Sequence, residues 1–265
     1  MRALVPHHAA LLLTALAPVW FPAPAHSQVE AELAPHALYA SVLDRYVENG
    51  AVRYGLLASE DPREWRRWLE WLEDARPEVM TVDGRRAFWI NAYNSRVIAG
   101  VLERYSIESV RDVGFLGGRV RGFFSRREHP VAGQLRTLDE IEKEILLARP
   151  LWDPRIHFAL NCAARSCPKL RPEPYEAARL DTQLDFQTRA FLNGPDGHRL
   201  DPTRKVLYVS RILDWYEEDF ARAAGSLREY LTRYLTGEAA AAARDPSWKI
   251  EFMDYDWSLN DAKAR

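Results

Sequence analysis

The sequence lacks the motifs by which most enzyme classes are identified. It contains no Gly-x-Gly-x-x-Gly turn, no phosphate loop, no Gly-x-Ser-x-Gly elbow and no His-Glu-x-x-His pair. These motifs serve dinucleotides, nucleotide phosphates, a nucleophilic serine and a catalytic zinc ion, respectively. The sequence therefore predicts no cofactor from these classes.

Histidine and cysteine are both scarce, and this scarcity argues against a metal centre. After residue 27 the chain has four histidines, namely His36, His129, His157 and His198. Its two cysteines are Cys162 and Cys167. Together with His157 they would supply three ligands, but the Cys-x4-Cys spacing is not that of a zinc site. We expect no metal.

The charges are balanced and contain no long basic run. Lys and Arg number 36 against 38 Asp and Glu, which gives a formal net charge of -2. This balance argues against a general nucleic-acid binder. An apolar fraction of 47% and a charged fraction of 28% are typical of a soluble globular protein with a substantial core.

The N-terminus carries a short apolar run, Ala9–Leu16, which is too short to span a membrane. Arg2 is the only charged residue before Glu30, and Ala25-His26-Ser27 resembles a small-x-small cleavage site. We interpret residues 1–27 as a secretory signal and expect a periplasmic or secreted protein. No cysteine directly follows the apolar run, which argues against a lipid anchor.

Residues 28–265 show no repeat and no linker, so a single globular domain is predicted, without a membrane span. Its centre is expected to be a helix over residues 84–104, which is apolar around most of its circumference and should be buried. Asn91 and Asn94 then need interior partners, because an unpartnered buried amide costs about 2 kcal/mol or more. Either they tie this helix to a neighbouring loop, or one of them orients a catalytic group or a ligand.

The remaining elements follow from periodicity and capping signals. Helices are predicted over residues 35–47, from Asp61 as N-cap through Leu72, from the Thr137–Glu140 capping box to Leu146, and over 175–192, 212–224 and 227–235. Extended segments are predicted over 52–57, in a hairpin within 114–133, and over 156–161, 206–210 and around 250. The fold class is α+β: a mainly helical single domain with a small sheet around a buried central helix.

The stretch from Arg155 to Pro168 holds both cysteines and His157, and it is predicted as a buried strand that ends in a turn. One interpretation is a Cys162–Cys167 disulfide, which an oxidising compartment favours and which would contribute about 2 kcal/mol. The other is a nucleophilic Cys167 with His157 as its base. His157 and Cys162 are five residues apart, and an odd separation puts two side chains on opposite faces of a straight strand. Cys167 lies beyond the turn and can fold back towards His157, so it is the better nucleophile.

The thiol interpretation needs supporting groups. Asn91 or Asn94 would orient the imidazole, with Asp219 and Asp256 as more distant candidates, and turn N–H groups would bind an oxyanion. Two cations, Arg165 and Lys169, flank Cys167 and would favour a thiolate. The alternative for His157 is a core histidine that is hydrogen-bonded to a carbonyl.

Four motifs occur in the order of a known family. They are Phe88-Trp-Ile-Asn-Ala-Tyr-Asn94, Ile156-His-Phe-Ala-Leu-Asn-Cys162 with Ser166-Cys-Pro168, Trp215-Tyr-Glu-Glu-Asp-Phe220 and Tyr255-Asp-Trp-Ser-Leu-Asn260. They resemble bacterial members of the domain of unknown function 547. The segment Leu138–Glu142 is similar too, but the family often has a histidine where this chain has Lys143. The resemblance implies an exported bacterial domain and no settled reaction.

Two functions remain open at this stage. The first is a thiol-dependent hydrolase or acyltransferase that uses Cys167 with His157. The second is a non-catalytic periplasmic binding or interaction module with a structural disulfide and a groove lined by Trp, Tyr and Arg. Its partner would be a small molecule or a peptide.

Overall fold

The computed structural model describes residues 25–114 and 122–262, with side chains from residue 35 onward. Most of the predicted signal and part of the predicted 114–133 loop lie outside these residues. The helices are α1 (Ala25–Tyr46), α2 (Tyr54–Glu60), α3 (Arg63–Asp74), α4 (Val82–Leu102), α5 (Leu180–Leu192), α6 (Ile212–Trp215), α7 (Glu217–Ala224), α8 (Leu227–Tyr234) and α9 (Gly237–Arg244). The strands are β1 (Val47–Glu48), β2 (Ala51–Val52), β3 (His129–Val131), β4 (Gln134–Arg136), β5 (His198–Asp201), β6 (Val206–Val209) and β7 (Lys249–Phe252).

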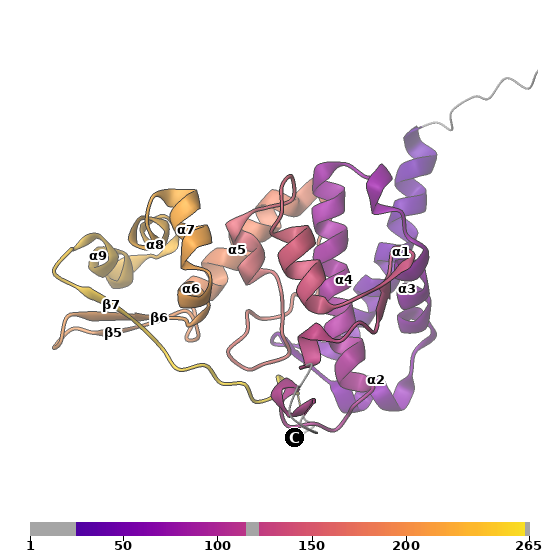
Figure 1. Ribbon diagram of the computed structural model, residues 1–265, viewed down its shortest axis with the longest axis horizontal. Coiled ribbons are helices and arrows are strands. Elements are labelled where there is room, and N and C mark those ends of the chain that lie inside the picture. The colour runs from indigo at the N-terminus through magenta and orange to yellow at the C-terminus, as the bar shows by residue number, and fades with distance from the viewer. Residues whose placement is uncertain (1–24, 115–121, 263–265) are drawn as a thin grey trace, which may run out of the picture.

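Helices α1 to α4 lie together at one end of the molecule, and α6 to α9 lie with the sheet β5-β6-β7 at the other (Figure 1). In that sheet β5 pairs with β6 antiparallel and β6 pairs with β7 parallel. Pairs β1–β2 and β3–β4 are separate hairpins. The predicted class, α+β and mainly helical with small sheets, is confirmed.

Helix α4 is the buried central helix that the sequence predicts. Thr81 caps it by accepting a hydrogen bond from the Gly84 N–H, 3.1 Å away. Nearly all residues from Ala87 to Val101 are buried. The predicted capping box is present too: Thr137 and Glu140 each accept a hydrogen bond from the backbone N–H of the other. It begins a π-helix (Glu140–Leu146) rather than an α-helix.

The strand predicted over 156–161 is wrong, because this segment begins with a short 3-10 helix, Pro154–Phe158. Asp153 caps it through the Arg155 N–H, and Pro154 occupies the first turn, where its missing N–H has no cost. Ile156 packs in one hydrophobic core and Phe158 in a second. A short apolar run that is buried on all sides has no periodicity that separates a strand from a helical turn.

Several other boundaries differ from the prediction. The helix predicted over 175–192 begins only at Leu180, after a 3-10 turn at Ala177–Arg179. The extended segment over 52–57 is wrong beyond Val52, because α2 begins at Tyr54. Asp61 is not the N-cap of α3: it ends α2 in the left-handed conformation, and Pro62 precedes the first helical residue. The predicted 212–224 helix breaks at Tyr216 into α6 and α7.

The hairpin predicted within 114–133 forms later in the chain, as β3 and β4 over residues 129–136. The Pro130–Gly133 segment does supply its return, because Ala132 and Gly133 both take positive φ at the turn. Positive φ at both central residues matches the right-handed twist of the two strands.

The segment after β7, residues 253–262, runs back across the molecule to the end that holds α2 (Figure 1). It bonds to several distant segments through its backbone. The Val52 N–H donates to the Asn260 carbonyl (3.0 Å), and the Asn260 N–H donates to the Ala163 carbonyl (2.9 Å). This C-terminal segment therefore connects the β1–β2 hairpin to the turn that contains the cysteines.

The β1–β2 turn lies against that same region, and it makes a testable prediction. Gly50 has φ +82°, its carbonyl accepts from the Leu170 N–H, and a Cβ there would collide with the Lys169 backbone and side chain. We expect Gly50→Ala to lower the free energy of unfolding by at least about 2 kcal/mol, as measured by urea denaturation. Gly133→Ala is the control, because Gly133 also has a positive φ but a Cβ added there would meet no atom within 4 Å. Equal losses in the two variants would contradict a role for the close approach.

Candidate functional site

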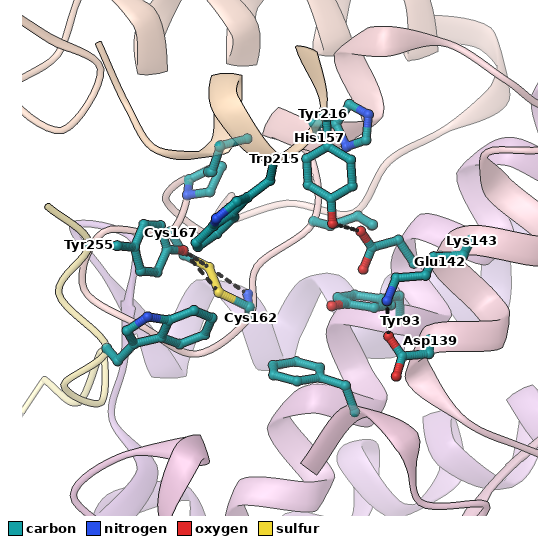
Figure 2. A pocket seen from close by; sticks show the side chains of 15 residues that line it. Tyr93, Asp139, Glu142, Lys143, His157, Cys162, Cys167, Trp215, Tyr216 and Tyr255 are labelled. Atoms are coloured by element: carbon teal, nitrogen blue, oxygen red, sulfur yellow. Dashed lines mark hydrogen bonds and ion pairs between the residues drawn. A yellow bond between two sulfur atoms is a disulfide. The ribbon is translucent and has the colours of Figure 1, made fainter. Parts of the chain in front are cut away.

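A cavity of about 250 Å³ lies where α4, the π-helix, the cysteine turn, α6 and the C-terminal segment meet (Figure 2). Six of its fifteen lining residues are Phe, Trp or Tyr, and the charged groups gather on the π-helix and its N-cap. The lining residues are Tyr93, Phe124, Asp139, Glu142, Lys143, His157, Leu160, Cys162, Cys167, Pro168, Ile212, Trp215, Tyr216, Tyr255 and Trp257. Its size is just below the roughly 300–1,000 Å³ of pockets for drug-sized ligands, so it fits a compact ligand.

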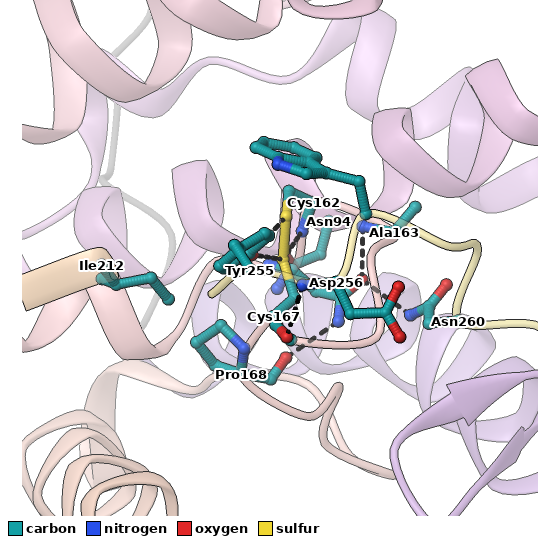
Figure 3. Close-up of a disulfide and its surroundings, with 12 residues drawn as sticks. Asn94, Cys162, Ala163, Cys167, Pro168, Ile212, Tyr255, Asp256 and Asn260 are labelled. Carbon is teal, nitrogen blue, oxygen red and sulfur yellow. Dashed lines mark hydrogen bonds between the residues drawn. A yellow bond between two sulfur atoms is a disulfide. The ribbon is translucent and has the colours of Figure 1, made fainter. Parts of the chain in front are cut away.

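The two cysteines form part of the cavity wall. Their Sγ atoms lie at disulfide-bonding distance, and Figure 3 shows the pair as a disulfide. The Cys162 N–H donates to the Cys167 Sγ at 2.8 Å. The Tyr255 hydroxyl lies 3.2 Å from each sulfur and donates to that of Cys167. Burial raises the pKa of Tyr255, so the hydroxyl keeps its proton at neutral pH.

Asn161 holds the cysteine turn in shape through three hydrogen bonds. Its side-chain N–H₂ donates to the Pro168 carbonyl at 2.8 Å, and its Oδ1 accepts from the Ala163 N–H at 3.0 Å. The same Oδ1 accepts from Asn260 Nδ2, also at 3.0 Å. Ala163 has φ +63°, so these bonds maintain a backbone conformation that an alanine rarely adopts.

His157 lies at the edge of the cavity, but its imidazole is enclosed. The Nε2 atom is 2.9 Å from Asp219 Oδ2, and the ring stacks on Tyr216 with centroids 3.9 Å apart. Only 1% of its side chain is exposed, and within the described part of the chain Nδ1 has no hydrogen-bond partner. Hydrogen bonding to His157 is the largest of the effects that hold the pKa of Asp219 below its usual range. Trp152 Nε1 and Arg222 also contact this carboxylate, each at 2.9 Å.

Asn91 and Asn94 do not orient His157. Asn91 forms two hydrogen bonds with the backbone of Tyr175, at 2.8 and 2.9 Å. Asn94 donates to the Ala159 carbonyl and accepts from the Asn161 N–H. Because both amides are saturated by backbone groups, the orienting partner of the imidazole is Asp219, which the sequence suggested only as a more distant candidate.

The other candidates, Asp256, Arg165 and Lys169, are not among the residues that line the cavity with His157. Asp256 accepts from the Ser258 N–H and caps the local turn. Arg165 and Lys169 line a separate hollow, which Cys167 also lines. Cys167 and His157 both line the cavity, yet the ring nitrogen that is bonded contacts Asp219 and not a sulfur atom.

The π-helix brings three charged residues to the cavity. Asp139 pairs with Lys143, and this hydrogen bond raises the pKa of Lys143. Glu142 accepts a short hydrogen bond from the Tyr216 hydroxyl, whose pKa is raised by burial and by Glu142. The Leu147 N–H bonds to the Glu142 carbonyl five residues earlier, which is the π spacing. Single-turn π segments are frequent at functional sites.

Glu142, Tyr216 and Tyr255 belong to the site but were not predicted from the sequence. All three lie in segments that resemble family motifs, and this resemblance was the available signal. In residues 25–114 and 122–262, no group of three or more Cys, His, Asp or Glu side chains is arranged to hold a metal ion. Of the helices in those same residues, none has both the length and the apolar character that a membrane crossing requires.

Comparison with known proteins gives one match. Among curated proteins and among solved structures, none matches the chain. Residues 77–192 match the model of the family described as protein of unknown function, DUF547, the family whose motifs the sequence resembles. The matched residues run from just before α4 to the end of α5. They include the π-helix and the cysteine turn, but not Trp215, Tyr216 or Tyr255.

Proposed function

We propose that this protein is a binding module for a compact molecule, in which the Cys162–Cys167 disulfide is a structural part of the cavity wall. The observation that carries the proposal is the position of the two sulfurs. They lie at bonding distance beside an aromatic cavity, and Tyr255 contacts both of them.

The enclosure of His157 also supports binding over thiol hydrolysis. A general base must reach the nucleophile by a hydrogen bond or through one water. Here the imidazole bonds to Asp219 and is covered by Tyr216 and Phe220. This arrangement is that of a histidine that fixes two buried segments to each other.

We further propose that the protein functions outside the cytosol, in the periplasm or after secretion. The support is the signal-like N-terminal sequence together with the close cysteine pair. Paired cysteines persist as disulfides in oxidising compartments and are rare elsewhere.

The test is a thiol count combined with a paired serine variant. Protein purified without reductant should take up no alkylating agent until it is unfolded and reduced, as judged by intact mass. Cys162→Ser/Cys167→Ser should lower the free energy of unfolding by about 2 kcal/mol, because the unfolded chain regains the freedom of a short closed loop. Ligand binding in the cavity should survive the double substitution. Two free thiols in the native protein, with fast alkylation of Cys167, would overturn the structural assignment.

A second candidate is a redox-gated thiol transferase, which one specific contact favours. Two donors, the Cys162 N–H and the Tyr255 O–H, already point at the Cys167 Sγ and would stabilise a thiolate there. A dithiol reductant would supply two electrons and two protons and become a disulfide itself. One proton would stay on Cys162 as a thiol and the other would pass to solvent, which leaves Cys167 as a thiolate. That thiolate would then attack an acyl carbon and displace its leaving group. After mild reduction, alkylation of Cys167 that is much faster than that of Cys162 near neutral pH would support this candidate.

A further inference from the structure

The cavity has two chemically different sides. Figure 2 shows Trp215 and Tyr255 on one side and Glu142 with Lys143 on the other. Trp215 is 46% exposed, and its ring centroid lies 4.8 Å from that of Tyr255. The two rings thus lie together in the cavity wall, opposite a carboxylate.

The charges on the lining favour a positive ligand. Two carboxylates, Asp139 and Glu142, share the lining with one ammonium, Lys143, which leaves one net negative charge. His157 also lines the cavity, but it is paired with Asp219, which does not. Asp139 neutralises Lys143 directly, so Glu142 is the carboxylate that remains. Glu142 accepts a hydrogen bond from the neutral hydroxyl of Tyr216, which orients the carboxylate without cancelling its charge.

Aromatic faces attract cations through their quadrupoles, and this attraction increases when the cation is desolvated. A neighbouring carboxylate adds a direct charge interaction in the same enclosed volume. Trp257 already has the guanidinium of Arg111 5.5 Å from its ring centroid, and it packs against Tyr255 with centroids 4.7 Å apart. Trp215 is the exposed ring of this wall. Neither a neutral ligand nor an anion gains from both sides of the cavity.

We propose that the ligand of this cavity is a compact organic cation, such as a small alkylammonium group, held between Glu142 and the Trp215–Tyr255 rings. This inference rests on the proposed binding function and specifies its ligand class.

The test compares three compact probes of similar shape and different charge on the full, oxidised protein. Tetramethylammonium, tert-butyl alcohol and pivalate are titrated at constant ionic strength, and the tryptophan indole N–H signals are followed by NMR. Tetramethylammonium should bind saturably and at least about tenfold more tightly than tert-butyl alcohol. Pivalate should bind most weakly.

Variants then assign the effect to the named residues. Glu142→Gln should weaken tetramethylammonium binding about tenfold, whereas Glu144→Gln, an exposed carboxylate on the same π-helix, should leave it unchanged. Trp215→Leu should weaken it several-fold. Lys143→Gln should strengthen it several-fold, and a gain in affinity cannot come from misfolding.

The outcomes separate this inference from the function beneath it. Equal binding of tetramethylammonium and tert-butyl alcohol, or tighter binding of pivalate, would overturn the cation assignment and leave the binding function standing. Binding of no probe, with unchanged indole signals throughout, would overturn both.

Discussion

Asn161→Ala is expected to lower the free energy of unfolding by about 3–5 kcal/mol, the largest effect of any single polar substitution proposed for this protein. Asn161 is 4% exposed, and its side chain satisfies three buried groups. These are the Pro168 carbonyl, the Ala163 N–H and the side-chain amide of Asn260. Removing the amide leaves each of them without its partner, and each buried unsatisfied group costs about 1–3 kcal/mol.

The variant should also change the cavity, because the cysteine turn forms one wall of it. We expect the Cys162–Cys167 bond to become more accessible to a dithiol reductant in Asn161→Ala than in the parent protein. Urea denaturation gives the stability, and the rate of reduction under native conditions gives the accessibility.

Asn260→Ala is the matched control for this prediction. It removes the single bond to Asn161 and the acceptor for the Tyr54 hydroxyl, but it leaves the two bonds from Asn161 to the turn. We expect a loss of about 1–2 kcal/mol and an unchanged rate of reduction. The double variant should lose less stability than the sum of the two single losses, because each single substitution already removes the Asn161–Asn260 hydrogen bond. A loss below about 1 kcal/mol in Asn161→Ala would contradict the central role of this amide.

Stability is expected to fall by about 3 kcal/mol as the pH is lowered from 6.5 to about 4, because of His129. Burial, followed by the charges of Arg96 and Arg104, lowers the pKa of His129 to about 4. The unfolded chain has the ordinary value near 6.5, so it binds the proton first as the pH falls. Stability from the neutral imidazole is therefore complete above pH 6.5 and is lost progressively down to the folded-state pKa.

The imidazole is 3% exposed, and within the described residues its Nε2 has no hydrogen-bond partner, so a proton there would find no acceptor. Measuring unfolding free energies between pH 7.5 and 5 keeps the carboxylates ionised and should capture about 2 kcal/mol of this fall. His129→Leu should remove most of the dependence of the unfolding free energy on pH that this histidine contributes. Val131→Ala, at a buried position of the same strand, should lower stability equally at every pH and retain the slope. An identical slope in His129→Leu would show that another group is responsible.

Local features were the ones that the sequence predicted well. The buried central helix follows from apolar residues around the whole circumference of α4, and the Thr137–Glu140 capping box involves residues three apart. The Pro154–Phe158 turn was predicted as a strand because its side chains pack into two cores at once. A run that is buried on every side shows no alternation of apolar and polar residues, so its pattern cannot separate a strand from a helical turn.

The site was predicted only in part, and the missing part is non-local. His157 meets Asp219 across 62 residues, Tyr216 meets Glu142 across 74, and Tyr255 meets Cys162 across 93. No periodicity or spacing encodes such pairings, and the nearer candidates, Asn91 and Asn94, bond to backbone groups instead.

By itself, the sequence determined the class of fold, the burial of α4 and the stretch around which the site forms, because helix periodicity, caps and cysteine positions are local properties. Only the tertiary structure decided which side chains share the cavity. The C-terminal segment returns across the molecule and brings Tyr255 to the cysteines, and the break at Tyr216 positions its ring between His157 and Glu142. Those contacts arise from the packing of distant segments, which is fixed when both cores are buried together.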